Sequence, residues 1–183
     1  MVTGANYLLE SGKTKILIDC GLFQGSNFCE KHNYEPFPYN PKSIDAVLIT
    51  HAHIDHIGRL PLLYKNGFRG EIFSTPPTRD FSEHLLLDSE HLLAKEAEEK
   101  NLPPLYSIND INKTMPLWKG AKYHQKLRVR GFEVEYYDAG HILGSSFIVV
   151  SAEGKRVVFS GDLGNVPAPL VKDTEKISGA DYA

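Results

Sequence analysis

The pattern of apolar and polar residues predicts a β-hairpin near the start of the chain and a buried strand after it. Residues 6–9 and 15–19 are mainly apolar runs, and Ser11-Gly12-Lys13 between them favours a turn. Residues 21–41 are rich in Gly, Asn, Pro and aromatic residues without a helical or strand period, which is typical of a long loop. Residues 45–50 are a short apolar run that predicts a buried strand.

A second group of strands is predicted from Leu127 onward. Residues 132–137 alternate between the two faces of a strand. Two further apolar runs, residues 147–150 and 156–160, flank Glu153-Gly154, and this combination predicts another hairpin. Strands are therefore expected at both ends of the chain.

Helices are predicted between these two groups of strands. The first covers residues 57–66. The longest begins after Thr75, which can serve as the N-cap with Pro76 at the first helical position, and it ends at Asn101-Leu102-Pro103. Its predicted apolar stripe consists of Phe81, Leu85, Leu92 and Leu93.

The order of these elements predicts a mixed α/β layered fold. A further short helix is expected from Ser107 to about Met115. Strands at both ends with helices between and beside them indicate a layered arrangement and not a simple βαβ repeat. A length of 183 residues fits one domain with a core of its own.

Composition and charge exclude few classes of function. The formal net charge of -3 provides no general attraction to nucleic acids or anionic membranes. The two cysteines, Cys20 and Cys29, are too few for a disulfide framework and lack the spacing of a zinc or redox pair. No segment has the ~20 apolar residues of a membrane span or the pattern of a signal peptide. These features predict a soluble cytoplasmic protein without a membrane partner.

One hexapeptide concentrates metal-binding side chains. Residues 51–56, His-Ala-His-Ile-Asp-His, follow the predicted buried strand directly and hold three of the eight histidines of the chain. Imidazole and carboxylate are the ligands that zinc prefers where no thiolate is present. In an extended loop His51 and His53 would point the same way, while Asp55 and His56 could turn toward a second metal ion. A solvent-exposed polar loop is the alternative, and the density of histidines disfavours it.

Three more residues repeat this arrangement at other strand ends. His141 lies between glycines just after the alternating strand, and Asp162 follows the apolar run that ends at residue 160. Asp19 ends the second strand of the hairpin, where its carboxylate could accept the second ring N–H of a metal-bound histidine. Each residue alone is weak evidence, but together they favour a catalytic metal site.

With its HxHxDH motif at residues 51–56, the sequence resembles the metallo-β-lactamase superfamily. Three further segments are similar to the β-CASP branch, which includes RNA-processing nucleases related to the cleavage and polyadenylation endonuclease and to ribonuclease J. These segments are ILIDCGLFQG at residues 16–25, GHILGS at residues 140–145 and FSGDLG at residues 159–164. The resemblance extends from Thr3-Gly4 to Tyr182.

The resemblance implies an αββα sandwich that binds two Zn²⁺ ions, with Mn²⁺ as an alternative. By similarity, His51, His53 and His141 would hold one ion. Asp55 and His56 would hold the other, Asp162 would bridge both, and Asp19 would lie behind the ligands. Asp55, His56 and Asp19 are the residues expected to act in catalysis. The implied reaction is cleavage of a phosphodiester in RNA, expected to be single-stranded, by a hydroxide held between the metals.

The resemblance further implies that residues 1–183 are a partial metallo-β-lactamase domain. The β-CASP cap and the returning half of the nuclease domain, with a last histidine ligand, would follow Ala183 in the family. An incomplete sandwich would expose an apolar face, and this predicts self-association or a completing partner.

Two other functions fit the same residues. The first is hydrolysis of a small ester, thioester or lactam, because one dinuclear core supports all of these reactions. The second is a zinc-binding interaction domain without activity. The cations of the segment from Lys119 to Arg130, with Tyr123 and His124 among them, could contact RNA. A solvated strand face is the favoured interpretation of that segment, and a surface or packing role is favoured for His84 and His91.

Overall fold

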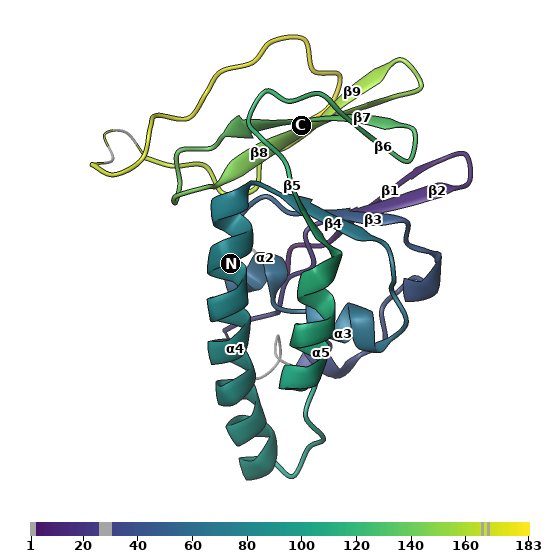
Figure 1. The fold of residues 1–183 in the computed structure, drawn as a ribbon, viewed down its shortest axis with the longest axis vertical. Coiled ribbons are helices and arrows are strands. Elements are labelled where there is room, and N and C mark those ends of the chain that lie inside the picture. Colours follow the sequence, from purple (N-terminus) through teal and green to yellow (C-terminus); the bar gives the residue numbers. More distant parts are fainter. Residues whose placement is uncertain (1–2, 26–30, 166, 168) are drawn as a thin grey trace.

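The computed structural model describes residues 3–25, 31–165, 167 and 169–183 as two β-sheets packed face to face, with the helices on one side (Figure 1). The expected mixed α/β layered fold is confirmed. The loop expected at residues 21–41 is described only in part, because residues 26–30 and Cys29 with them lie outside the described residues. Its described portion contains the 3-10 helices η1 (His32–Tyr34) and, directly after it, η2 (Pro41–Ser43).

The first sheet has five strands in the order of the sequence. The expected hairpin forms its antiparallel edge pair, and the other neighbouring strands run parallel. The last two strands, which are only three or four residues long, are not evident from the sequence pattern. The strands are β1 (Tyr7–Ser11), β2 (Thr14–Ile18), β3 (Ala46–Leu48), β4 (Glu71–Ser74) and β5 (Trp118–Gly120).

The second sheet is antiparallel and has four strands in the order of the sequence. The alternation expected at residues 132–137 is confirmed, because Phe132, Val134 and Tyr136 are buried while Glu133 is exposed. The strands are β6 (Leu127–Val129), β7 (Phe132–Asp138), β8 (Ser146–Ala152) and β9 (Lys155–Phe159).

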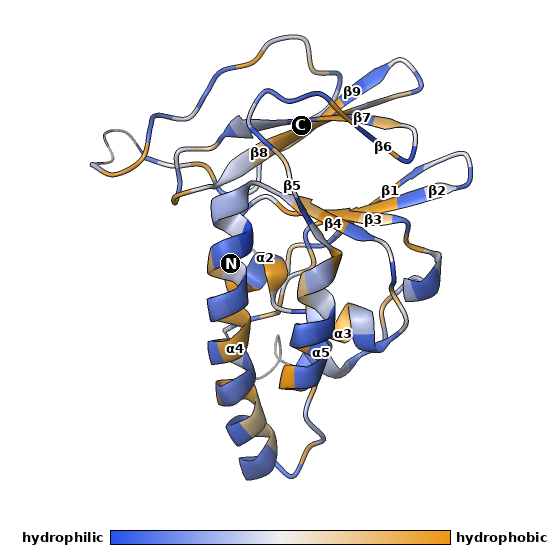
Figure 2. Cartoon of the chain, viewed as in Figure 1, coloured by the Kyte–Doolittle hydropathy of each residue, from blue (hydrophilic) through white to orange (hydrophobic). Residues whose placement is uncertain are grey.

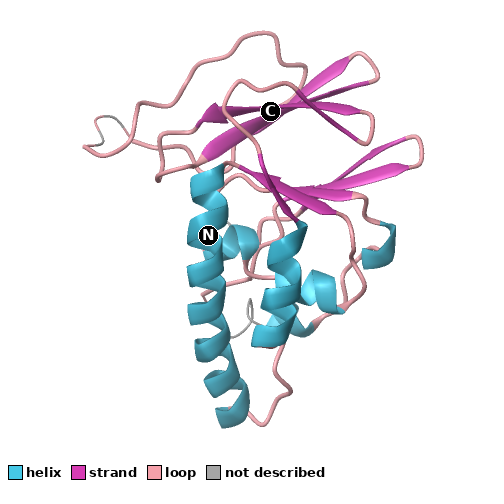
Figure 3. Cartoon of the chain, in the orientation of Figure 1, coloured by secondary structure: helices cyan, strands magenta, loops and turns pink. Residues whose placement is uncertain are grey.

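The helices lie against the face of the first sheet that points away from the second, as Figure 3 shows most plainly. The single helix expected at residues 57–66 is wrong, because Gly58 and Arg59 separate two short helices. The described α-helices are α2 (Ile54–Ile57), α3 (Leu60–Lys65), α4 (Pro76–Glu99) and α5 (Ile108–Thr114), and α5 leads into the 3-10 helix η3 (Met115–Leu117). In α5, Ser107 and Asp110 form a capping box, which confirms the expected start.

Two apolar layers organise the packing. One lies between the sheets and includes Ile16, Leu48, Tyr136 and Ile148, all fully buried. The other lies between the first sheet and the helices. Figure 2 shows the same division, with hydrophobic colour concentrated on β3, β4 and β8 and hydrophilic colour dominating α4.

The outer face of the second sheet carries a smaller apolar cluster, against which Ile177 packs. No helix covers this face within the described ranges. The helix–sheet–sheet layers of the predicted sandwich are therefore present, and an extended segment takes the outer position. None of the helices in the described part of the chain combines the length and apolar character needed to cross a membrane.

Helix α4 starts and ends as expected, but the predicted apolar stripe is correct only in part, because two of its four residues, Leu85 and Leu93, pack against the core. Phe81 and Leu92 are exposed, whereas the buried positions are mostly small residues at helical spacing. These buried residues are Thr78, Ser82, Leu86, Ser89 and Ala97. Thr75 stands at the N-cap position, yet its hydroxyl donates to the carbonyl oxygen of Gly144 instead of capping the helix. The start of α4 is thus tied to the loop that carries His141.

A pair of leucines on α4 tests this corrected face. We expect Leu86→Ala to lower the free energy of unfolding by about 2–5 kcal/mol, because the side chain is fully buried and its loss leaves a cavity. The matched change Leu92→Ala should alter it by less than about 0.5 kcal/mol, since that side chain is 60% exposed. Urea denaturation measures both values, and equal effects would contradict the assigned face.

Candidate metal centre

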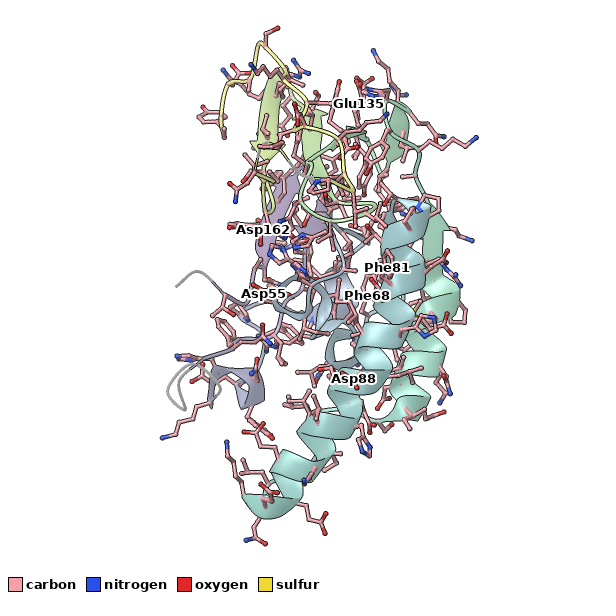
Figure 4. The ribbon with its side chains drawn as sticks, turned by 90° about the vertical axis from the view of Figure 1, so that its left-hand side faces the viewer. Asp55, Phe68, Phe81, Asp88, Glu135 and Asp162 are labelled. Carbon is pink, nitrogen blue, oxygen red and sulfur yellow. The ribbon has the colours of Figure 1, made fainter. Side chains whose placement is uncertain are left out.

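The ends of four strands deliver the candidate ligands to one end of the sandwich. Asp19 follows β2, and the histidines of the hexapeptide follow β3. His141 follows β7, and Asp162 follows β9. The residues therefore come from both sheets and meet because the sheets are packed together. Figure 4 shows Asp55 and Asp162 on the same side of the molecule, at this end of the sheets.

Three imidazoles and one carboxylate form a first group of ligand atoms. His53 Nδ1 lies 3.0 Å from His51 Nε2 and 3.2 Å from His141 Nε2. Asp162 Oδ2 lies 3.8 Å from His51 Nε2 and 3.6 Å from His141 Nε2. One ligand atom from each of the four residues lies within 4.8 Å of all the others. All four residues are among the metal ligands expected from the sequence.

The contacts within this first group fit a bound cation. A ring nitrogen offers either one hydrogen or one in-plane lone pair, so His53 Nδ1 can make only one of its two short contacts as a hydrogen bond. A cation at the centre would satisfy all of these atoms at once. Nitrogen ligands at ~2.0–2.1 Å around a tetrahedral zinc ion lie ~3.3 Å apart, which is close to the separations observed here. The donor set of imidazole and carboxylate also suits zinc or manganese.

Burial favours the neutral form of two imidazoles of the first group, those of His51 and His53. Burial, together with the neighbouring His56, His53 and His141, lowers the pKa of His51 to about 2. Burial and the nearby His141 also lower the pKa of His53. Neutral imidazole is the form that binds a metal ion, so the site does not have to release these protons near neutral pH.

A second group of ligand atoms lies beside the first and shares Asp162 with it. His56 Nε2 lies 3.4 Å from Asp162 Oδ1 and 4.0 Å from Asp55 Oδ2. Asp162 therefore presents Oδ1 to this group and Oδ2 to the first, which is how a bridging carboxylate is arranged. Asp55, His56 and Asp162 also line a cavity of about 630 Å³.

Asp19 fixes the orientation of His56 from behind. Its Oδ2 lies 2.7 Å from His56 Nδ1, and both residues are buried. Burial lowers the pKa of His56, but the hydrogen bond and charge of Asp19 outweigh it, so that the pKa is raised overall. Asp19 has a φ of 58°, a conformation uncommon for a residue other than glycine. Its carboxylate also accepts hydrogen bonds from Thr50, which the sequence analysis did not identify.

The extended loop expected for the whole hexapeptide is corrected at its second half. His53 precedes the first turn of α2, and Asp55 and His56 lie within that helix. The backbone of residues 20–22 packs against this turn, since Cys20 N donates to His56 O and Leu22 N donates to Ile54 O. A Cβ on Gly21 would collide with the carbonyl group of Asp55. Glycine is needed there because the two backbones approach closely.

The other candidate residues lie outside the cluster. His84 and His91 are exposed on α4, as expected. In the cationic segment, Arg128 pairs with Glu133 and Lys126 lies 3.9 Å from Glu135. The hydroxyl of Tyr123 donates to the Ser145 carbonyl oxygen, which turns it inward. This geometry matches the solvated strand face favoured from the sequence.

Two packed sheets with helices on one side form an α/β fold. The histidine and carboxylate cluster at one end is typical of a metal-binding protein. Residues 8–165 match the family described as the metallo-beta-lactamase superfamily domain, and the chain belongs to this superfamily. A solved metallo-beta-lactamase fold protein, YhfI from Bacillus subtilis, superposes with a TM-score of 0.53 at 17% identity. The superposed region covers 87% of this chain and 55% of the YhfI chain. This likeness supports the fold alone.

The similar curated proteins carry names from RNA processing and transcription. Ribonuclease TTHA0252 of Thermus thermophilus is 38% identical over 94% of this chain and 38% of its own length. Transcription termination factor FttA of Methanosarcina mazei is 38% identical over 85% of this chain and 24% of its own length. These relatives confirm the resemblance to the RNA-processing branch. The chain spans well under half the length of either relative.

Cys20 lies next to Asp19 but belongs to the apolar core. It is free and fully buried, and burial raises the pKa of its thiol to about 12. In a Cys29→Ser variant at pH 8, we expect alkylation of Cys20 by iodoacetamide to be roughly a thousandfold slower than that of an ordinary thiol, because so little thiolate is present. Mass spectrometry over time measures the rate. Denaturing urea should restore rapid alkylation, and rapid labelling of the folded protein would contradict the buried placement.

Proposed function

We propose that this chain provides the metal centre of a hydrolase that cleaves RNA phosphodiester bonds. The observation that carries the proposal is the division of Asp162, with one oxygen toward His51 and His141 and the other toward His56. Two groups of ligand atoms that share one carboxylate suit two metal ions of the kind used in phosphoester hydrolysis. RNA is proposed as substrate because relatives of this chain are named ribonucleases.

Each residue of the cluster has a separate role in the proposed reaction. His51, His53 and His141 would hold one ion, Asp55 and His56 the other, and Asp162 would bridge them. Bound zinc or manganese ions would lower the pKa of a water molecule and offset negative charge on the phosphate. Asp19 would keep the ring of His56 in place, and the carboxylate of Asp55 would help to orient the attacking water molecule as well as hold a metal ion.

The open side of the cluster supports a polymeric or otherwise large substrate. The side chain of Asp162 is 47% exposed and that of Asp55 is 25% exposed, while His51 is almost completely buried. Both carboxylates border the cavity of about 630 Å³, so a substrate could reach the second group without displacing the buried histidines.

Cleavage of end-labelled single-stranded RNA with added Zn²⁺ or Mn²⁺ tests the activity. We expect His56→Ala to reduce the cleavage rate by about 100-fold or more, because it removes a proposed metal ligand. His91→Ala is the matched control, since His91 is exposed on α4, and it should leave the rate unchanged. A chromogenic lactam measured beside the RNA separates a small-substrate hydrolase from a nuclease. Zinc binding without turnover of either substrate would instead favour an inactive metal-binding domain.

Metal removal tests the centre independently of activity. We expect two Zn²⁺ ions per chain in elemental analysis and fewer in Asp162→Asn, because this substitution weakens the shared ligand. Zinc at 100 times its dissociation constant should stabilise the folded protein by about 2.7 kcal/mol, so that EDTA lowers the thermal midpoint. A midpoint that does not respond to zinc or EDTA would count against the metal centre.

A further inference from the structure

We propose that Thr50 is a positioning residue whose single hydroxyl orients His51 directly and His56 through Asp19, and so links the two metal positions. The proposal rests on the proposed metal centre and deepens it. Thr50 directly precedes the hexapeptide, two residues after the end of strand β3, and only 1% of it is exposed. No metal ligand role is assigned to it.

The hydroxyl of Thr50 lies at the centre of a small polar network. It donates to Asp19 Oδ2 at 2.8 Å, and it lies 3.1 Å from His51 Nδ1 and 3.4 Å from His56 Nδ1. The backbone N–H of Thr50 donates to the other carboxylate oxygen of Asp19 at 2.8 Å. Asp19 in turn contacts His56 Nδ1 at 2.7 Å. Thr50 and Asp19 therefore contact the metal-distant nitrogen of both histidines.

Counting hydrogens assigns the direction of each contact. A hydroxyl has one hydrogen, and an ionised carboxylate can only accept, so the Thr50 hydrogen belongs to Asp19. The hydroxyl oxygen can then only accept from His51, which places a hydrogen on His51 Nδ1 and a lone pair on Nε2. His56 Nδ1 faces Asp19 Oδ2, which can only accept, so His56 Nδ1 also carries a hydrogen. Each Nε2 lone pair is then directed to the ligand atoms of its own group.

The surroundings of Thr50 leave its side chain little freedom. Its carbonyl oxygen accepts from both the backbone N–H and the hydroxyl of Ser146, at the start of β8. A Cβ on Gly161 would lie 2.8 Å from Thr50 Cβ, so the second sheet reaches this side chain closely. Asp19 N donates to Leu48 O and anchors the carboxylate to β3. The network is thus held by the backbone of both sheets.

Replacement by valine separates the hydroxyl from the shape of the side chain. Thr50→Val keeps the branched shape but leaves His51 Nδ1 without an acceptor, whereas the contact of Asp19 with His56 remains. The substitution should therefore leave the ring orientation of His51 less well fixed, with a smaller effect on the ring of His56. Loss of a residue that orients a metal ligand typically lowers affinity by about 10–100-fold. Thr50→Ser keeps the hydroxyl and should therefore retain most of the zinc affinity.

The test combines zinc affinity with the hydrogen placement on the histidines of the metal-free protein. Competition with a chromogenic chelator measures the two zinc affinities of the full chain, and long-range ¹H–¹⁵N NMR identifies which ring nitrogen carries hydrogen. We expect Thr50→Val to weaken, by about 10–100-fold, the zinc-binding step in which His51 is a ligand. In the metal-free variant, His51 should no longer carry its ring hydrogen on Nδ1 alone. Thr114→Val is the matched control, because Thr114 is also fully buried but donates within α5, to Asp110 O.

Each outcome decides the proposal. Normal zinc affinities in Thr50→Val, or no recovery in Thr50→Ser, would overturn it. An Nε2–H form of His51 in the unsubstituted protein would overturn it as well, even if the valine variant does not fold. Failure of the unsubstituted chain to bind zinc would overturn the proposed function, while the NMR measurement would still decide the role of Thr50.

Discussion

The apolar layer between the two sheets is the interaction on which the metal centre depends. Ile16 and Leu48 of the first sheet pack in this layer with Tyr136 and Ile148 of the second. The hexapeptide follows the first sheet, whereas His141 and Asp162 follow the second, so neither sheet alone contains the first group of ligands. Because the burial of apolar surface has no preferred direction, more specific contacts must set the final alignment. The hydrogen bonds from Ser146 to Thr50 O meet this need at the edge of the site.

Burial of the histidines then has an electrostatic consequence. Placing polar rings in a poorly solvated environment disfavours their charged form, and each neighbouring imidazole adds to this effect for His51. The same environment strengthens the hydrogen bonds of Asp19 to Thr50 and His56. The cluster thus combines the neutral rings of His51 and His53 with the ring of His56, which the carboxylate of Asp19 holds from behind. Such a constellation is unfavourable unless a cation occupies its centre, and the stability of the rest of the domain must compensate for it.

The sequence predicted the cluster better than the elements that carry it. Residues of the hexapeptide, His141 and Asp162 were recognisable because rare side chains recur at the ends of apolar runs. Strands β4 and β5 were missed, since three or four residues contain too little alternation, and pairing with neighbours defines them. The apolar stripe of α4 was predicted only in part because Ser82, Ser89 and Ala97 also face the core, where small side chains permit close packing. Thr50 was missed since a threonine at a strand end has no distinctive pattern until its contacts are known.

The ligand side chains differ in their access to solvent, and this difference follows from their positions in the fold. His51 is 1% exposed and His56 is 6% exposed, and the hydroxyl of Thr50 contacts the ring of His51 from the buried side. Asp162 is 47% exposed on a loop and turns one oxygen to each group. A carboxylate that is open to solvent can adjust while the buried imidazoles keep their geometry. In a hydrolase of the proposed kind, the buried imidazoles would therefore serve as the fixed reference, and the substrate would approach from the side of Asp55 and Asp162, which border the cavity.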